Sequence, residues 1–120
     1  LGGVLEHTGI LIDENKIVEL HGSGLIKAIS PERFLKERSG KDIYVACDSQ
    51  GEAIVDEFTA ERAVSHIYSY QEYDLIKNNC HRFVWQCITA RQEDITTFYQ
   101  LNKLFSKRYD RKIYWDKWHF

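Results

Sequence analysis

One cysteine, Cys80, is well placed for nucleophilic chemistry. It follows the pair Asn78-Asn79, and apolar residues recur at helical spacing after it: Phe83, Val84, Cys87 and Ile88. Asn79 is therefore expected to cap a helix that runs to about Ala90, with Cys80 in its first turn. Unpaired backbone N–H groups at a helix start favour an anion, which lowers the pKa of a thiol and makes it a usable nucleophile.

The other two cysteines are expected to be structural. Cys87 lies about two turns farther along the same side of the helix, among apolar residues, and is predicted to belong to the core. Cys47 ends an expected strand and has no base near it in the sequence. Three cysteines without metal-ligand spacing indicate free thiols in a reducing compartment, and no metal or cofactor is predicted.

A thiol nucleophile needs a base, and His7 is the best candidate of the five histidines. It lies in a segment rich in β-formers, Val4 to Ile12, and a strand fixes a side chain better than a loop does. His81 follows Cys80 directly, so on a helix its side chain points about 100° away, which makes it a poor partner.

A third group should orient the imidazole, and Glu19 and His21 share one face of the next expected strand. A three-residue loop at 13–15 would place His7 opposite His21 and diagonal to Glu19, with Asn15 in the left-handed conformation. A four-residue loop would put His7 on the other face, so the site predicts the shorter loop. Glu19 is the preferred orienting residue, and His21 is the reserve candidate.

The elements that must position these residues indicate an α+β fold, with an antiparallel sheet packed against helices. Strands separated by polar turns form a β-meander over 4–12, 17–21 and 25–29, and a fourth strand is expected at 42–47. A short helix should run from Ser30-Pro31 to about Arg38. Further helices are predicted at 60–70, 79–90 and 93–109.

Composition excludes several classes of protein. The chain has 120 residues, of which 43% are hydrophobic and 28% charged, with a net charge of −2. These values fit one globular domain, 1–120, and give no strong field toward nucleic acid. No apolar run approaches the roughly 20 residues of a membrane span. The start, Leu1-Gly2-Gly3, does not resemble a signal peptide, and the lack of methionine is expected of a trimmed fragment.

Positive charge and aromatic residues are concentrated at the C-terminal end of the chain. Residues 103–120 hold six basic, two acidic and six aromatic residues, so we divide the chain into a body, 1–90, and a C-terminal helix with a basic aromatic tail, 91–120. Such a tail suits an anionic membrane surface, and a single-stranded nucleic acid nearly as well. A helix packed on the domain with a solvated basic face is an equal alternative.

Three segments together resemble the lecithin:retinol acyltransferase (LRAT-like) family: His7-Thr8-Gly9-Ile10-Leu11-Ile12, Ile17-Val18-Glu19-Leu20 and Asn79-Cys80-His81-Arg82-Phe83-Val84. That family is similar to NlpC-type cysteine peptidases, with the papain-like order circularly permuted so that the His strand precedes the Cys helix. The resemblance covers about 3–88. It implies that Cys80 is the nucleophile and His7 the base. Glu19 stands where the family commonly has a second His, and the strand usually found before the His strand is missing.

The resemblance implies a cysteine-dependent acyltransferase or hydrolase that acts through a thioester on an ester or amide. Its eukaryotic members imply lipid acyl groups, and the wider superfamily implies peptide-like substrates. The alternative function is a non-catalytic binding module that keeps the fold, with a basic aromatic tail facing a membrane or nucleic acid. We expect a cytoplasmic protein, with peripheral membrane contact through 103–120 and no specific nucleic acid.

Overall fold

The computed structural model describes residues 7–36, 41–74 and 79–120. The order of elements is β1 (Ile10–Asp13), β2 (Lys16–Leu20), β3 (Ile26–Ile29), α1 (Pro31–Lys36), β4 (Ile43–Cys47), α2 (Glu57–Ser65), α3 (Cys80–Thr89), α4 (Phe98–Tyr109) and β5 (Tyr114–Trp118). The α+β class is confirmed. The first part of the expected strand over 4–12 and the expected end of the helix at Arg38 lie outside the described residues.

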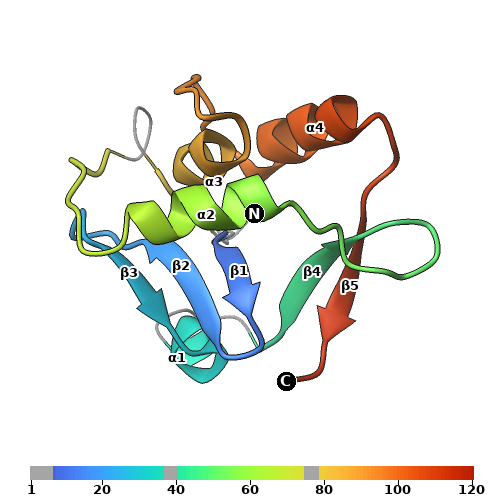
Figure 1. Ribbon diagram of the computed structural model, residues 1–120, viewed down its shortest axis with the longest axis horizontal. Coiled ribbons are helices and arrows are strands. Elements are labelled where there is room, and N and C mark those ends of the chain that lie inside the picture. Colours follow the sequence, from blue (N-terminus) through green and yellow to red (C-terminus); the bar gives the residue numbers. More distant parts are fainter. Residues whose placement is uncertain (1–6, 37–40, 75–78) are drawn as a thin grey trace.

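The strands form two antiparallel sheets (Figure 1). β1, β2 and β3 pair in chain order, as the predicted meander requires, and α2 and α3 pack against this sheet. β4 instead pairs with β5, from Ile43 opposite Trp118 to Cys47 opposite Tyr114. The expectation of one sheet is therefore wrong, because the C-terminal segment supplies the partner strand for β4.

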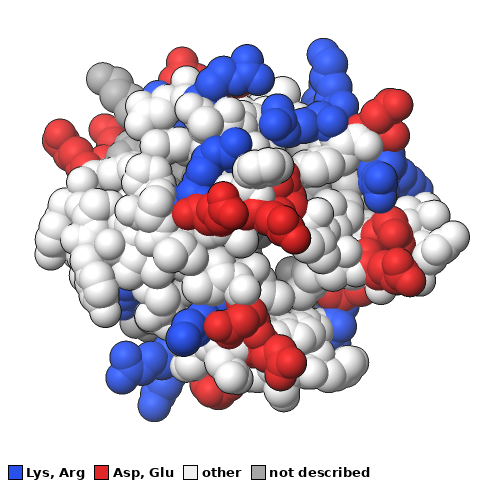
Figure 2. Space-filling view, viewed as in Figure 1, with Lys and Arg blue, Asp and Glu red and all other residues white. Residues whose placement is uncertain are grey.

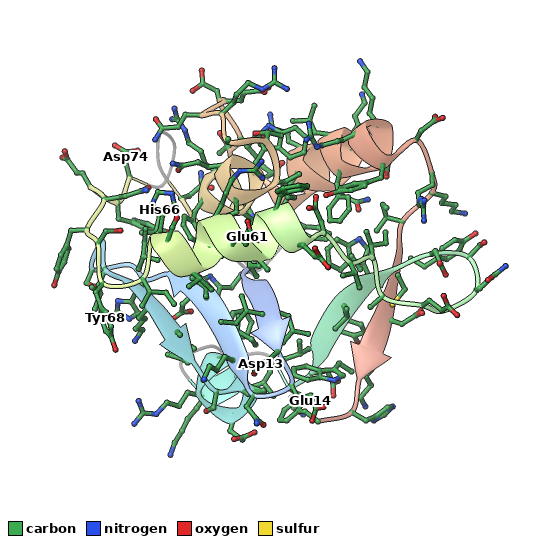
Figure 3. All side chains as sticks on the ribbon, viewed as in Figure 1. Asp13, Glu14, Glu61, His66, Tyr68 and Asp74 are labelled. Atoms are coloured by element: carbon green, nitrogen blue, oxygen red, sulfur yellow. The ribbon has the colours of Figure 1, made fainter. Side chains whose placement is uncertain are left out.

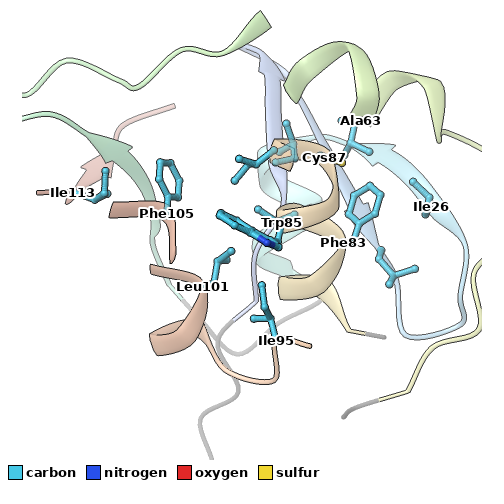
Figure 4. Close-up of a cluster of buried hydrophobic side chains, with 14 residues drawn as sticks. Ile26, Ala63, Phe83, Trp85, Cys87, Ile95, Leu101, Phe105 and Ile113 are labelled. Atoms are coloured by element: carbon cyan, nitrogen blue, oxygen red, sulfur yellow. The ribbon is translucent and has the colours of Figure 1, made fainter. Parts of the chain in front are cut away.

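Helix α3 lies at the centre of the hydrophobic core, with eight of its ten residues buried. Phe83 lies on the side of Ile26 in β3, whereas Trp85 lies on the side of Leu101 in α4 (Figure 4). Each large apolar side chain buried in this way contributes roughly 1.5–3 kcal/mol to folding. The helix that carries Cys80 is thus held from both sides.

Two helices begin at caps that the periodicity did not locate. The helix expected at 60–70 runs from Glu57 to Ser65. It begins earlier than expected because the Asp56 side chain accepts hydrogen bonds from backbone N–H groups in its first turn. The helix expected to begin at Glu93 begins at Phe98, after a capping box between Thr97 and Gln100.

The basic aromatic segment 103–120 is part of the fold rather than a loose tail. It forms the second half of α4 and all of β5, and Phe105 and Ile113 are buried in the core. Its six basic side chains are exposed: Lys103, Lys107, Arg108, Arg111, Lys112 and Lys117. On the face shown in Figure 2, Lys and Arg side chains lie among acidic side chains on the α4 side of the surface. Among the described residues, no helix has the length and apolar character that crossing a bilayer requires.

Candidate active site

Cys80 is the first residue of α3, and Asn79 caps that helix as predicted. The Asn79 side-chain oxygen accepts a hydrogen bond from the Arg82 backbone N–H at 3.0 Å. The side-chain amide of Asn79 also donates to the carbonyl of Ile95 at 2.8 Å, which ties the start of α3 to the segment before α4. Cys80 is 5% exposed, so its thiol is held at a fixed and nearly buried position.

His7 contacts the buried carboxylate that was expected to orient it. The distance between His7 Nε2 and Glu19 Oε1 is 2.7 Å, and Glu19 is fully buried. The ring of Phe34 in α1 packs on the imidazole, with 4.9 Å between ring centroids. β1 begins only at Ile10, so the expectation that His7 lies inside the strand is wrong, and side-chain contacts hold it instead.

A β-bulge sets the register that brings His7 to Glu19. Ile10 lies opposite Val18, which is the register that a three-residue loop would give. The turn nevertheless contains only two residues, Glu14 and Asn15, and Asn15 is not left-handed. Figure 3 labels Asp13 and Glu14, where β1 ends and the turn begins. The bulge at 11–13 takes up the extra residue, so the predicted register is present although the predicted loop is wrong.

A close backbone approach also fixes the His7 segment, and the sequence analysis missed it. A Cβ atom at Gly9 would lie 2.7 Å from Ile17 Cγ2 and 3.0 Å from the carbonyl oxygen of Val18. Only glycine lets the chain lie this close to β2 at that point. The segment 7–9 is thereby pressed against the strand that carries Glu19.

The Cys80 thiol has a pKa lowered to about 5. Burial alone would raise this pKa, but hydrogen bonds and charge from His7 and His81 outweigh it. Because His7 Nε2 contacts Glu19, we assign Nδ1 as the ring nitrogen that acts on Cys80. The arrangement therefore favours a thiolate beside an imidazole, which is backed in turn by a carboxylate.

His81 contradicts the sequence-based expectation of a poor partner, because it helps to lower the pKa of the Cys80 thiol. Its ring is 6% exposed, and Nδ1 is 3.0 Å from Thr8 Oγ1. The helical offset of about 100° fixes only the direction of the Cβ atoms, and the side-chain torsions then decide where the ring lies. Neither Thr8 nor His81 was identified as a site residue from the sequence.

His21, the reserve candidate, is engaged within its own turn. Its Nδ1 accepts a hydrogen bond from the Ser23 backbone N–H at 3.1 Å and lies 2.9 Å from the Ser23 hydroxyl. Glu19 therefore occupies the position beside His7 that either residue was expected to take. Its second carboxylate oxygen lies 3.8 Å from Lys27 Nζ on β3.

The other two cysteines differ from Cys80 in the direction of their pKa shift. Burial raises the pKa of Cys87 to about 12. Burial, together with the nearby carboxylate of Asp116, also raises the pKa of Cys47. All three thiols are free. These directions agree with the expectation that Cys47 and Cys87 are structural.

One hollow of the surface lies apart from Cys80, His7 and Glu19. A hollow of about 460 Å³ lies at the turn after β4 and the start of β5. Cys80, His7 and Glu19 do not line it. Its lining residues are Asp48, Ser49, Gln50, Arg111, Lys112 and Tyr114. Within the described part of the chain, no group of three or more histidine, cysteine, aspartate or glutamate residues is arranged to hold a metal ion.

Cys80, His7 and Glu19 thus form a continuous series of contacts from a helix start, through an imidazole, to a buried carboxylate. Such a series can move a proton from a thiol to a ring nitrogen and stabilise the imidazolium that results.

Comparison of the chain with protein-family models, curated proteins and solved structures found no match.

Proposed function

We propose that the protein is a cysteine-dependent acyltransferase or hydrolase that forms a thioester on Cys80. The observation that carries this proposal is the contact series from Cys80 through His7 to Glu19, with the 2.7 Å bond between His7 and a fully buried carboxylate. Cys80 is the nucleophile, His7 the base and Glu19 the residue that orients the imidazole.

The reaction begins when Nδ1 of His7 takes the proton of the Cys80 thiol. The thiolate then attacks the carbonyl carbon of an ester or amide, and a sulfur–carbon bond forms. His7 returns its proton to the departing alcohol or amine as the original carbon–oxygen or carbon–nitrogen bond breaks. Water or a second acceptor next gives its proton to His7 and attacks the thioester, which releases the acyl group and restores the Cys80 thiolate.

The start of α3 supplies stabilisation for the oxyanion in this mechanism. The Asn79 side chain occupies the Arg82 N–H, so backbone N–H groups nearer the helix start are the donors for the carbonyl oxygen. The positive end of the helix dipole adds to this effect. Removal of one such donor typically costs about 10²–10³ in turnover.

The order of the elements supports an LRAT-like fold with the papain-like order circularly permuted. The segment that carries His7 precedes the meander β1–β3, and the helix that carries Cys80 follows it. We therefore extend the proposal to the substrate classes that this resemblance implies, lipid acyl esters and peptide-like amides. A carboxylate in place of the family's usual second histidine is compatible with the mechanism, because it stabilises the imidazolium directly.

We further propose that the protein works in the cytoplasm and contacts anionic membranes at their surface. Three free cysteines are typical of a reducing compartment. The exposed basic side chains of 103–120, with the exposed rings of Tyr114 and Phe120 among them, are the surface for that contact.

The test is direct detection of the thioester. The protein is incubated with a panel of activated esters, phospholipids and peptides, and intact mass spectrometry is used to detect an acyl adduct. The expected adduct maps to Cys80 and is absent from Cys80→Ser. If every acyl donor leaves the mass unchanged, or if the adduct lies elsewhere, the protein is instead the non-catalytic binding module.

A further inference from the structure

Two consecutive residues before β1, His7 and Thr8, face two consecutive residues at the start of α3 in the proposed site. His7 contacts Cys80, and the next residue on each segment makes a second contact, between Thr8 Oγ1 and His81 Nδ1 at 3.0 Å. The two segments are 73 residues apart in the sequence. The second contact joins the segment before β1 to the first turn of α3.

His81 is a buried ring with little freedom to turn. It is 6% exposed, and Phe98 of α4 packs edge-on against it at 6.2 Å between centroids. Thr8 holds Nδ1 from the other segment. When a buried imidazole is hydrogen-bonded at one nitrogen and packed against another ring, its second nitrogen points in one fixed direction.

From this geometry we propose that His81 is a second hydrogen-bond donor to the Cys80 thiolate and that Thr8 is the residue that positions it. The inference rests on the proposed function, because it assigns roles around the same nucleophile. It adds two residues, Thr8 and His81, to the site. The lowered pKa of Cys80, to which His81 contributes, agrees with this assignment.

The two imidazoles have different partners and therefore different roles. His7 is backed by the buried carboxylate of Glu19, which stabilises its protonated form, so His7 is the ring that takes the proton. The polar partner of His81 is the hydroxyl of Thr8 rather than a carboxylate, so we assign His81 the role of a hydrogen-bond donor and not that of the base. The charged and titratable groups around Cys80 are thus His81 on its own helix, His7 on the segment before β1, Glu19 on β2 and, beyond it, Lys27 on β3.

The experiment measures the rate of iodoacetamide labelling of Cys80 across pH, with peptide mass spectrometry to assign the site. Thr8→Val keeps the shape of the side chain and removes the hydroxyl, whereas Thr8→Ser keeps the hydroxyl. His81→Asn removes the ring. The matched controls are Thr96→Val and His119→Asn, at exposed positions.

We expect the midpoint of the labelling profile to move up by about one pH unit or more in Thr8→Val and His81→Asn. Thr8→Ser and both controls should keep the midpoint of the unchanged protein. If Thr8→Val does not fold, His81→Asn decides the question. Unchanged midpoints in these two variants, with a low midpoint in the parent protein, would overturn the roles of Thr8 and His81 alone. A parent midpoint near that of an ordinary thiol, about 8.5, would instead overturn the proposed function.

Discussion

His7 and Glu19 are joined across two segments by a 2.7 Å contact between Nε2 and Oε1, with the carboxylate fully buried. A buried carboxylate is costly unless charged or hydrogen-bonding groups surround it. Here the imidazole lies on one oxygen, and Lys27 lies 3.8 Å from the other. The contact therefore fixes both the direction of the ring and the nitrogen that remains for Cys80.

Glu19→Gln tests the charge in this contact, because the amide retains the shape of the side chain. We expect acyl transfer to slow by about tenfold or more, since the imidazolium loses its counter-charge. His7→Ala should slow it further, because a base is harder to replace than an orienting group. Stopped-flow measurement of thioester formation gives both rates. Glu61→Gln on the exposed face of α2 is the control, and an equal loss there would contradict the role of Glu19.

Gly9→Ala tests the close approach of the His7 segment to β2. The added Cβ would lie 2.7 Å from Ile17 Cγ2, so the segment must move or β2 must shift. We expect a loss of about 1–3 kcal/mol in the free energy of unfolding and slower labelling of Cys80. Gly22→Ala is the matched control, because nothing lies within 4 Å of its added Cβ. Equal behaviour of the two variants in urea unfolding and in labelling would show that the approach is unimportant.

Asp56 offers a prediction for stability and pH. Burial tends to raise the pKa of Asp56, but hydrogen bonds from Tyr109, whose hydroxyl donates to Oδ2 at 2.6 Å, and from the start of α2 lower it overall. A lowered folded-state pKa means that the carboxylate stabilises the fold above its ordinary value of 3.8 and that this contribution is lost as pH falls through the folded-state value.

We therefore expect Asp56→Ala to lower the free energy of unfolding by about 1–2 kcal/mol at pH 7, and by progressively less below about pH 4. Urea unfolding at several pH values measures this difference. Tyr109→Phe should reproduce part of the loss, because it removes one hydrogen bond and leaves the cap. A difference that grows as the pH falls would contradict the assigned direction of the shift.

Exposed basic residues of 103–120 allow a test of membrane contact that spares the fold. Removing the whole segment would expose the core and leave β4 without its partner, so point changes are preferable. Replacing Lys107, Arg111 and Lys112 with Gln should weaken binding to phosphatidylserine vesicles by more than about tenfold at low salt. The labelling profile of Cys80 should stay the same. Equal vesicle sedimentation for both proteins would exclude this surface as the contact.

Local features of the sequence were sufficient to predict the helix that carries Cys80. Asn79 and the apolar residues after it lie within three turns, so the cap and the buried face could both be inferred from adjacent residues. The meander was equally accessible, because alternating strands and polar turns are short-range signals. The assignment of Cys87 to the core followed from its apolar neighbours in the helix, and burial raises the pKa of this thiol.

Features that depend on distant parts of the chain were not predictable in the same way. β5 pairs with β4 about 70 residues earlier, so the basic aromatic segment had no local sign of a strand partner. The ring of His81 is held by Thr8, 73 residues away, and periodicity gives no information about that torsion. The bulge at 11–13 replaced the expected loop residue without a change of register, and no turn residue signals it.

The central claim, that Cys80 is a thiolate activated by His7, is tested most directly by labelling with iodoacetamide from pH 4 to pH 10. Only the deprotonated sulfur reacts, so the rate follows the thiolate fraction. The account predicts a midpoint near pH 5 for Cys80, far slower labelling of Cys47 and Cys87, and a midpoint at least about two units higher in His7→Ala. A midpoint near 8.5 for Cys80, or the same midpoint with and without the His7 ring, would contradict it.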